Sequence, residues 1–275
     1  MDFKNELKEL ENRTRIVSQT IEECSWIENK IGYVERSSGN ISHTMTEYQK
    51  DFIYALNNPS FRHIYFVKHR CAGFTTTYAA HLAHELETKE GTSYLIICPN
   101  GQMCDELKGI LLRDIGRCVI RRDRKRVVFA TPNTCIEKTI SRCFDECFVD
   151  ESAYIPNFKE IFWHLNCCLT PNGKIVCVTT RGNDDNTFER FINEPDEEGN
   201  VYKQNVYWWE NPGLNKNLKW VKVEPEPTID NEGNIAVNKE KFLEKIKDGW
   251  MPKAPKMDAL KQLLGNKQEI EYFDI

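Results

Sequence analysis

Two patterns of apolar and polar positions alternate along this chain between residues 47 and 178. Segments with apolar positions three or four apart predict amphipathic helices, and short continuous apolar runs predict buried strands. The helices are expected at residues 47–56, 75–87, 103–115, 134–141 and 158–168. The strands are expected at residues 64–67, 94–98, 127–130, 147–149 and 175–178. Regular alternation of this kind predicts an α/β fold with a parallel sheet and helices on both of its faces.

The two ends of the chain have different patterns. Residues 4–29 are charged with scattered apolar positions, which predicts one or two surface helices, and a linker rich in Gly, Ser and Asn follows at 32–42. Beyond residue 190 prolines recur, which indicates a separate, irregular region. We therefore expect a helical extension and linker at 1–43, a core at 44–194 and a small subdomain at 195–275.

The net charge of −5 argues against a protein that coats nucleic acid by bulk electrostatics, since neutralising phosphates requires clustered lysine and arginine. Any contact with DNA must then be local. The best candidate is the basic segment 117–126, for which a solvated hairpin is the favoured alternative.

Eleven cysteines occur in a chain that begins without an apolar signal-peptide region, and no stretch approaches the length of a membrane span. The cysteines are therefore expected to be reduced, as in cytosolic proteins. Cys147 and Cys177 fall inside predicted strands and are expected to be small buried apolar residues rather than zinc ligands.

A short polar turn joins the predicted strand 64–67 to the predicted helix 75–87. Phosphates bind at such junctions, because backbone N–H groups at the helix N-terminus point at the anion and the helix dipole favours negative charge. The turn reads Lys68-His69-Arg70-Cys71-Ala72-Gly73-Phe74-Thr75-Thr76. It keeps the second glycine and the hydroxyl of the pattern G-x-x-x-x-G-K-[ST], but Lys68 replaces the first glycine and Phe74 replaces the lysine. Alone, the turn is a weak match to a phosphate loop.

Two further predicted strands end in polar side chains. The apolar run that begins at Phe144 ends in Asp150 and Glu151, the arrangement in which P-loop ATPases present a magnesium-binding acid and a water-activating acid. The run that begins at Lys174 ends in Thr179 and Thr180. Parallel strands direct their carboxyl ends to one edge of the sheet, so all three strand ends are expected to meet in one ligand-binding crevice.

Together these segments resemble the large terminase subunits of tailed bacteriophages, the ATP-driven motors that package DNA into capsids. Tyr48-Gln49-Lys50-Asp51 resembles the family's adenine-recognition motif, and Arg70, Gly73 and Thr75-Thr76 resemble its deviant phosphate loop. Val149-Asp150-Glu151 is similar to the carboxylate motif, and Thr179-Thr180-Arg181-Gly182-Asn183 is similar to the ATPase coupling motif. The order and spacing of these motifs resemble those of the family from Tyr48 to about Phe191.

The resemblance implies a P-loop NTPase core of the ASCE type, with ATP and Mg²⁺ as cofactors and a small lid-like subdomain after it. In the family an RNase H-like nuclease domain follows. The segment 268–275 looks like the stretch just before that nuclease, so we interpret this chain as the motor half.

The motifs assign roles to individual residues. Thr75 and Asp150 would bind Mg²⁺, and Glu151 would polarise the attacking water. Because Phe74 carries no charge, Arg70 and Lys68 are the cations available for phosphate, and Arg70 is also the candidate catalytic arginine. Thr179 and Thr180 would couple hydrolysis to motion. The nucleotide-binding candidates are Gln49, Lys68, Arg70, Cys71, Ala72, Gly73, Phe74, Thr75 and Thr76.

Each role has a structural alternative. Thr75 could serve as a helix cap, and Gln49 could be a surface residue on an amphipathic helix instead of the partner of adenine. The two adjacent acids could occupy a solvated helix N-terminus, although the apolar strand before them disfavours this. Arg181 stands where the family often has proline, which leaves a trans-acting role and a surface salt bridge both open.

The favoured function is ATP hydrolysis coupled to translocation of double-stranded DNA into a procapsid. The resemblance implies a portal protein and a small terminase subunit as partners, a homo-oligomeric ring on the capsid and a location in the host cytoplasm. One alternative is a catalytically silent assembly or DNA-docking module that has lost the loop lysine, but such a module has no reason to retain Glu151 beside Asp150. Another helicase-like translocase is disfavoured, since no arginine-rich helicase motif follows Gly182.

Overall fold

A computed structural model of the chain divides into two units, Met1–Val34 with Asn40–Asn205, and Glu35–Gly39 with Val206–Ile275. The structure describes residues 3–30, 33–34, 41–42, 44–115, 127–180, 188, 192–193, 199–215, 219–224, 226–229 and 250–253. The candidate basic segment 117–126 and Arg181 lie outside these residues.

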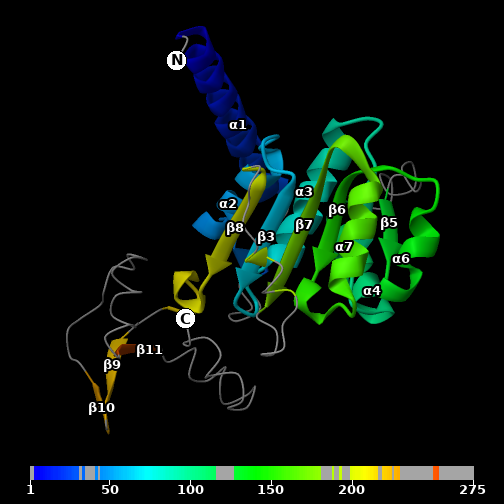
Figure 1. Ribbon diagram of the computed structural model, residues 1–275. Coiled ribbons are helices and arrows are strands. Elements are labelled where there is room, and N and C mark those ends of the chain that lie inside the picture. Colours follow the sequence, from blue (N-terminus) through cyan, green and yellow to red (C-terminus); the bar gives the residue numbers. More distant parts are fainter. Residues whose placement is uncertain are drawn as a thin grey trace. The chain divides into compact units, whose positions relative to one another are not determined.

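A six-stranded sheet forms the centre of the first unit (Figure 1). Its strands are β3 (His63–Lys68), β4 (Tyr94–Ile97), β5 (Val127–Ala130), β6 (Phe144–Asp150), β7 (Leu169–Thr180) and β8 (Val201–Val206). They lie in the order β5-β4-β6-β7-β3-β8. Every pair from β5 to β3 is parallel, and Figure 1 shows β8 running in the same direction as β3. The predicted parallel α/β fold is confirmed, and β6, β7 and β3 are neighbours whose polar ends lie at one edge.

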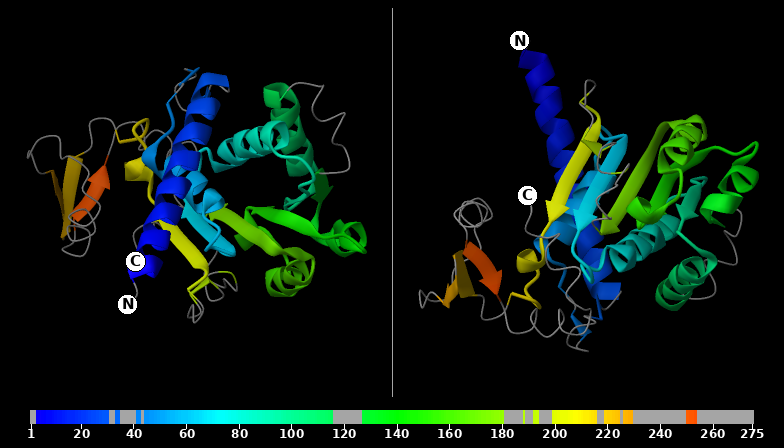
Figure 2. Two further views of the ribbon diagram at one scale, coloured as in Figure 1. Left: turned by 90° about the horizontal axis from the view of Figure 1, so that it is seen from above. Right: turned by 60° about the horizontal axis from the view of Figure 1, so that its bottom comes forward.

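Helices cover both faces of this sheet (Figure 2). They are α1 (Phe3–Lys30), α2 (Glu47–Asn57), α3 (Phe74–Thr88), α4 (Gly101–Ile115), α6 (Pro132–Thr139) and α7 (Phe158–Cys167). On one face α3 contacts α4, and α1 contacts both α2 and α3. On the other face α6 contacts α7. The predicted surface helices of the N-terminal extension are thus one long helix, and its second half is packed against the core.

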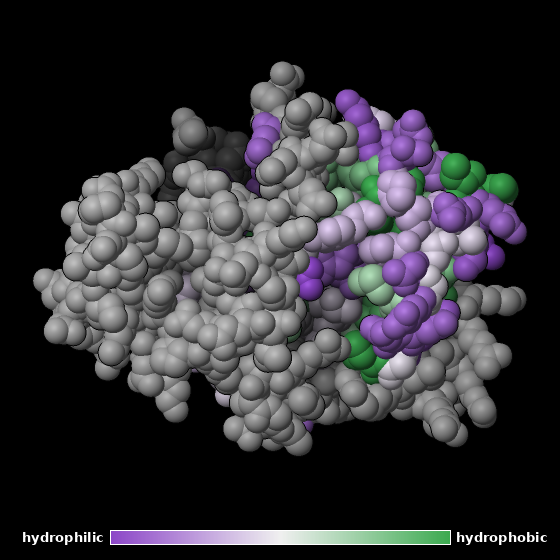
Figure 3. Space-filling view, turned by 90° about the horizontal axis from the view of Figure 1, so that it is seen from below, coloured by the Kyte–Doolittle hydropathy of each residue, from purple (hydrophilic) through white to green (hydrophobic). Residues whose placement is uncertain are grey.

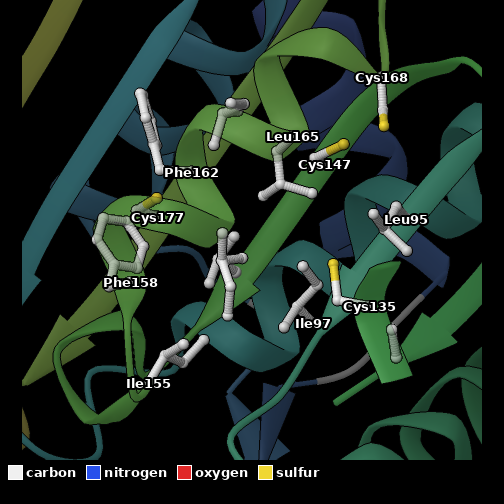
Figure 4. Close-up of a cluster of buried hydrophobic side chains, with 14 of the residues drawn as sticks. Leu95, Ile97, Cys135, Cys147, Ile155, Phe158, Phe162, Leu165, Cys168 and Cys177 are labelled. Atoms are coloured by element: carbon white, nitrogen blue, oxygen red, sulfur yellow. The ribbon is translucent and has the colours of Figure 1, made fainter. Parts of the chain in front are cut away.

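The core is built on the alternation of side chains along the strands. In β6, Cys147 joins the cluster under α6 and α7, with Leu165 and Cys177 among its other members (Figure 4). The next residue, Phe148, faces the opposite side and stacks on Tyr78 of α3, with ring centroids 3.7 Å apart. Cys147 and Cys177 are fully buried, as the sequence predicted for small apolar residues.

The edge strand β8 lies within the range predicted for the C-terminal subdomain, yet it joins the core sheet. Its sequence, Val-Tyr-Lys-Gln-Asn-Val, contains no continuous apolar run, so the pattern used for the other strands did not predict this one. Within the predicted linker, β1 (Tyr33–Val34) and β2 (Ile41–Ser42) pair antiparallel.

The second unit contains a short 3₁₀ helix and a small sheet of its own. The 3₁₀ helix η2 covers Trp208–Glu210. In the sheet β9 (Lys219–Glu224) pairs antiparallel with both β10 (Glu226–Ile229) and β11 (Trp250–Lys253). Its role as a lid stays a prediction.

The described part of the chain contains no helix long and apolar enough to cross a membrane. On the surface seen in Figure 3, hydrophilic side chains separate several smaller hydrophobic areas. Such scattered apolar exposure is ordinary for a protein surface.

Candidate nucleotide-binding site

The candidate phosphate loop runs from the end of β3 to the start of α3. Gly73 is the residue before the helix, with φ of 81° and ψ of 8°, a left-handed conformation that favours glycine. A Cβ atom at this position would lie 2.7 Å from Gln49 Nε2, which is too close. Cys71 also has a positive φ, 62°, and is exposed. The left-handed conformation of these two residues therefore lets the backbone of the turn approach a ligand at the N-terminus of α3 closely.

Gln49 of α2 holds this loop in place. Its Nε2 donates to the Ala72 carbonyl oxygen at 3.1 Å, and its Oε1 accepts from the Thr46 backbone N–H at 3.0 Å. The side chain is buried, so the alternative of a surface glutamine is wrong. Both ends of the amide are engaged with backbone, and pairing of Gln49 with adenine stays a prediction.

Phe74, which replaces the lysine of the standard loop, points into the core. Its ring packs against the rings of Tyr48, Phe52 and Phe66 at centroid distances of 5.8, 5.0 and 5.0 Å. The side chain is 1% exposed. A candidate nucleotide-binding residue by sequence, Phe74 can thus contribute only its backbone N–H to a phosphate, and its side chain anchors the start of α3.

Phe74 is expected to contribute to stability and little to catalysis. Phe74→Ala should lower the free energy of unfolding by about 3–5 kcal/mol, because it leaves a large cavity, whereas Phe74→Leu should cost much less. Turnover per folded molecule should stay near wild type in both variants. Urea unfolding with a parallel ATPase assay measures the two effects, and a large loss of turnover in a stably folded Phe74→Leu would contradict this assignment.

Thr75 and Asp150 meet at the edge of the sheet, as the sequence predicted. The Thr75 hydroxyl donates to the Asp150 carboxylate, with distances of 3.1 Å to Oδ2 and 3.3 Å to Oδ1. Two adjacent oxygen ligands of an octahedral Mg²⁺, each about 2.1 Å from the ion, lie roughly 3 Å apart. A hydroxyl and a carboxylate at this separation therefore fit Mg²⁺. In the present structure the two groups form a hydrogen bond with each other.

Glu151 is bound by residues at the ends of two other strands, β3 and β7. Its Oε1 accepts from Lys68 Nζ at 2.6 Å, and its Oε2 accepts from the Thr180 backbone N–H at 2.9 Å. The Thr180 hydroxyl lies 3.1 Å from the same Oε2. Glu151 adopts a left-handed conformation, φ 47° and ψ 48°, as the chain leaves β6 and enters the 3₁₀ helix η1 (Ser152–Tyr154). This turn directs Glu151 away from Asp150, which allows the two acids to divide their roles.

The two acids differ in their electrostatic surroundings. Burial raises the pKa of Asp150 to about 6, although Lys68 and the Thr75 hydroxyl favour its ionised form. Burial also acts to raise the pKa of Glu151, but the charge and hydrogen bond of Lys68 together with the bonds from Thr180 lower it below its ordinary value. Glu151 is thus held as a carboxylate, the form a proton acceptor needs.

The remaining candidates are distributed around this cluster. Arg70 is exposed in the loop, and among the described residues its guanidinium has no hydrogen-bond or ion-pair partner. Thr76 is partly buried in the first turn of α3. Thr179 is buried, and its Oγ1 accepts from the Ala153 backbone N–H at 3.1 Å, which ties the end of β7 to the segment after Glu151.

Two contacts near the site were not expected from the sequence. Tyr154 follows Glu151 by three residues, and its hydroxyl lies 3.3 Å from Thr180 Oγ1. His69 Nδ1 lies 2.6 Å from the Arg70 carbonyl oxygen, which assigns the proton to that nitrogen, and its ring is buried. The position of Tyr154 and His69 beside the motif residues was the available signal.

His69 is expected to make the chain sensitive to acid. Burial lowers its pKa to about 4, whereas the unfolded chain binds the proton near pH 6.5. The stability that neutral His69 contributes is therefore lost as pH falls below about 6.5. Between pH 7 and pH 5 the wild type should lose about 2 kcal/mol more unfolding free energy than His69→Gln. Urea titrations of both proteins at the two pH values measure this difference, and equal losses would contradict it.

Comparison with protein families finds no matching family model, and no curated protein matches the chain. Solved structures show the predicted resemblance to terminases. The HK97 bacteriophage large terminase is 12% identical over 64% of this chain and 43% of its own, with a TM-score of 0.47. The large terminase ATPase domain of a Thermus phage is 13% identical over 54% of this chain and 76% of its own, with a TM-score of 0.40. The chain thus spans less than half of the HK97 protein.

An ATPase of another kind is similar to a comparable degree. The Sulfolobus solfataricus SWI2/SNF2 ATPase core, solved in complex with double-stranded DNA, is 14% identical over 59% of this chain and 44% of its own, with a TM-score of 0.41. At such distances the function of the chain has to be inferred from its own site.

Proposed function

We propose that this chain is a magnesium-dependent ATPase and that it serves as the motor of viral double-stranded DNA packaging. The observation that carries the ATPase assignment is the contact of Thr75 with Asp150, next to Glu151, at one edge of the sheet. These residues come from the start of α3 and the end of β6. They supply a hydroxyl, a metal-binding acid and a proton acceptor beside the N-terminus of a helix.

ATP would bind with its phosphates against the backbone N–H groups of the loop and the positive end of α3. Thr75 and Asp150 would hold Mg²⁺, which neutralises charge on the phosphate oxygens. Arg70, exposed at the turn, can direct two N–H groups at the γ-phosphate. The loop backbone and these side chains thus orient the terminal phosphate toward Glu151.

Hydrolysis would then proceed by attack of water on the γ-phosphorus with cleavage of the bond to the bridging oxygen. Glu151 accepts the proton of that water, and ADP and inorganic phosphate are formed. In the present structure Lys68 occupies Glu151 Oε1. Phosphate oxygens would compete for Lys68, which would free this carboxylate oxygen for the water.

The packaging role rests on the combination of motifs resembling those of large terminases. Thr180 contacts Glu151 directly, so loss of the γ-phosphate can be transmitted to β7 through a single side chain. We propose double-stranded DNA as the substrate that is moved, with a portal protein, a small terminase subunit and further copies of the chain in a ring as partners.

The isolated chain is expected to bind ATP with Mg²⁺ and to hydrolyse it slowly, because a full ring and DNA are missing. Calorimetry measures binding, and a steady-state assay with and without Mg²⁺ measures turnover. Failure of any nucleotide to bind at millimolar concentration would contradict the proposal. Binding without magnesium-dependent turnover would favour the silent module that the replacement of lysine by Phe74 suggests.

A further inference from the structure

A second polar cluster lies between α1 and α3, near the opposite end of α3 from the phosphate loop. Glu23 of α1 and His84 and Glu85 of α3 each present one ligand atom, and these atoms lie within 4.8 Å of one another. Their side chains are 1%, 15% and 7% exposed. His84 follows Thr75 by nine residues, which corresponds to about 14 Å along a helix axis. The cluster is thus separate from the nucleotide site.

His84 presents a buried ring nitrogen to this cluster. Its Nδ1 is buried without a hydrogen-bond partner among the described residues and lies 3.9 Å from Glu23 Oε2, beyond hydrogen-bonding distance. A buried polar atom without a partner costs free energy and calls for an explanation. The neighbouring His81 shows the contrast, since its Nδ1 lies 2.6 Å from Glu23 Oε1.

The two carboxylates are held by a second set of hydrogen bonds. Asn57 Nδ2 donates to Glu23 Oε2 at 2.7 Å. The Tyr94 hydroxyl donates to Glu85 Oε2 at 3.0 Å, and Lys89 Nζ lies 2.8 Å from the same atom. Metal-binding carboxylates typically have such outer hydrogen bonds, which fix their orientation and leave other lone pairs for the ion.

We propose that Glu23, His84 and Glu85 bind a divalent transition-metal ion of the zinc class. One imidazole nitrogen and two carboxylate oxygens suit Zn²⁺, whereas Mg²⁺ prefers oxygen ligands alone. Ligands about 2.0–2.2 Å from a tetrahedral zinc ion lie roughly 3.3–3.5 Å apart, so the side chains need to close by up to about 1.5 Å. A water molecule completes the coordination.

The ion would fasten α1 to α3. It joins two helices that are otherwise connected at this point by the pair Glu23–His81 and by Asn57 through α2. Because α3 begins at the phosphate loop, the proposed site stabilises the helix that carries Thr75 without touching nucleotide. Its expected consequence is a metal-dependent rise in thermal stability.

Calorimetric titration of the full chain with ZnCl₂ alone, in a buffer with a phosphine reductant and no nucleotide, tests this site. The wild type should bind one equivalent, and its Tm should rise by several degrees at hundredfold excess over Kd. His84→Ala and Glu85→Gln should each weaken binding at least tenfold and abolish the Tm shift. His164→Ala, which removes a histidine elsewhere, should bind as the wild type does.

Trp26 supplies an independent readout, because its ring lies edge-on to His84 with a centroid distance of 5.2 Å. Co²⁺ should quench the wild-type fluorescence more than that of Trp26→Phe, and circular dichroism confirms that each variant is folded. Two results would overturn the proposal: no binding by the wild type, or binding that persists in both His84→Ala and Glu85→Gln. The second result would place the metal on residues outside this cluster. Neither result bears on ATP hydrolysis.

Discussion

Replacing Glu151 with glutamine is expected to reduce ATP turnover on the order of a hundredfold or more while ATP binding stays nearly intact. Glutamine keeps the size of the side chain and can still accept a hydrogen bond from the Thr180 backbone N–H, but it cannot take a proton from water. The measurement is steady-state turnover beside calorimetric ATP affinity.

The variant also removes the ionic partner of Lys68, whose side chain is 7% exposed. A buried ammonium without its carboxylate is destabilising, so the melting temperature has to be compared and turnover normalised to folded protein. Asp150→Asn is the companion variant. It should weaken the magnesium dependence of nucleotide binding, because the lost charge belongs to the residue that would hold the metal. Wild-type binding and turnover in both variants would show that this strand end is not catalytic.

Arg70→Ala is expected to abolish hydrolysis, and Lys68→Ala is expected to weaken nucleotide binding. Charge on the transferred phosphoryl group requires a nearby cation, an arginine in that role can contribute about 10³–10⁵ in rate, and Phe74 cannot serve. Arg70 is exposed at the turn, whereas Lys68 is bound to Glu151, so the two cations have different tasks. Turnover at saturating ATP and ATP affinity, measured for each variant, separate these tasks.

Arg142→Ala is the matched control, because Arg142 is also exposed but lies outside the site. It should leave both quantities unchanged. Lys68→Ala has a second expected effect, since Glu151 loses the charge that lowers its pKa and turnover should shift toward higher pH. Wild-type turnover in Arg70→Ala would mean that the cation comes from elsewhere, such as Arg181 or a neighbouring subunit, and the assignment of the loop would be wrong.

The convergence of Thr75, Asp150, Glu151 and Thr180 was predictable because it follows from strand direction. Asp150, Glu151 and Thr180 stand at the carboxyl end of an apolar run or just beyond it, Thr75 begins the helix that follows such a run, and a parallel sheet brings these ends together. The helical spacing of three to four residues and the continuous apolar runs also predicted the helices and most strands to within a few residues, since burial on one face or on both faces sets those patterns.

What the sequence did not predict depends on contacts between distant segments. The pairing of Lys68 with Glu151 joins residues 83 positions apart, and that of Glu23 with His81 joins residues 58 positions apart. Neither pair can be recognised from the local sequence. A charged residue has the same letter in the sequence whether its side chain is solvated or buried beside a partner. The burial of Gln49 was open in the sequence for the same reason, since it depends on contact with Ala72, 23 residues away.

The aromatic packing of Phe74 constrains the routes by which this loop can change. A lysine at position 74 would place an ammonium among Tyr48, Phe52 and Phe66, or would turn outward and leave a cavity there. The single substitution Phe74→Lys is therefore expected to destabilise the protein. A lysine fits this position only if the surrounding rings are replaced by smaller side chains or shift. Gain of the standard lysine thus requires several coordinated substitutions, whereas a change of the exposed Arg70 requires one.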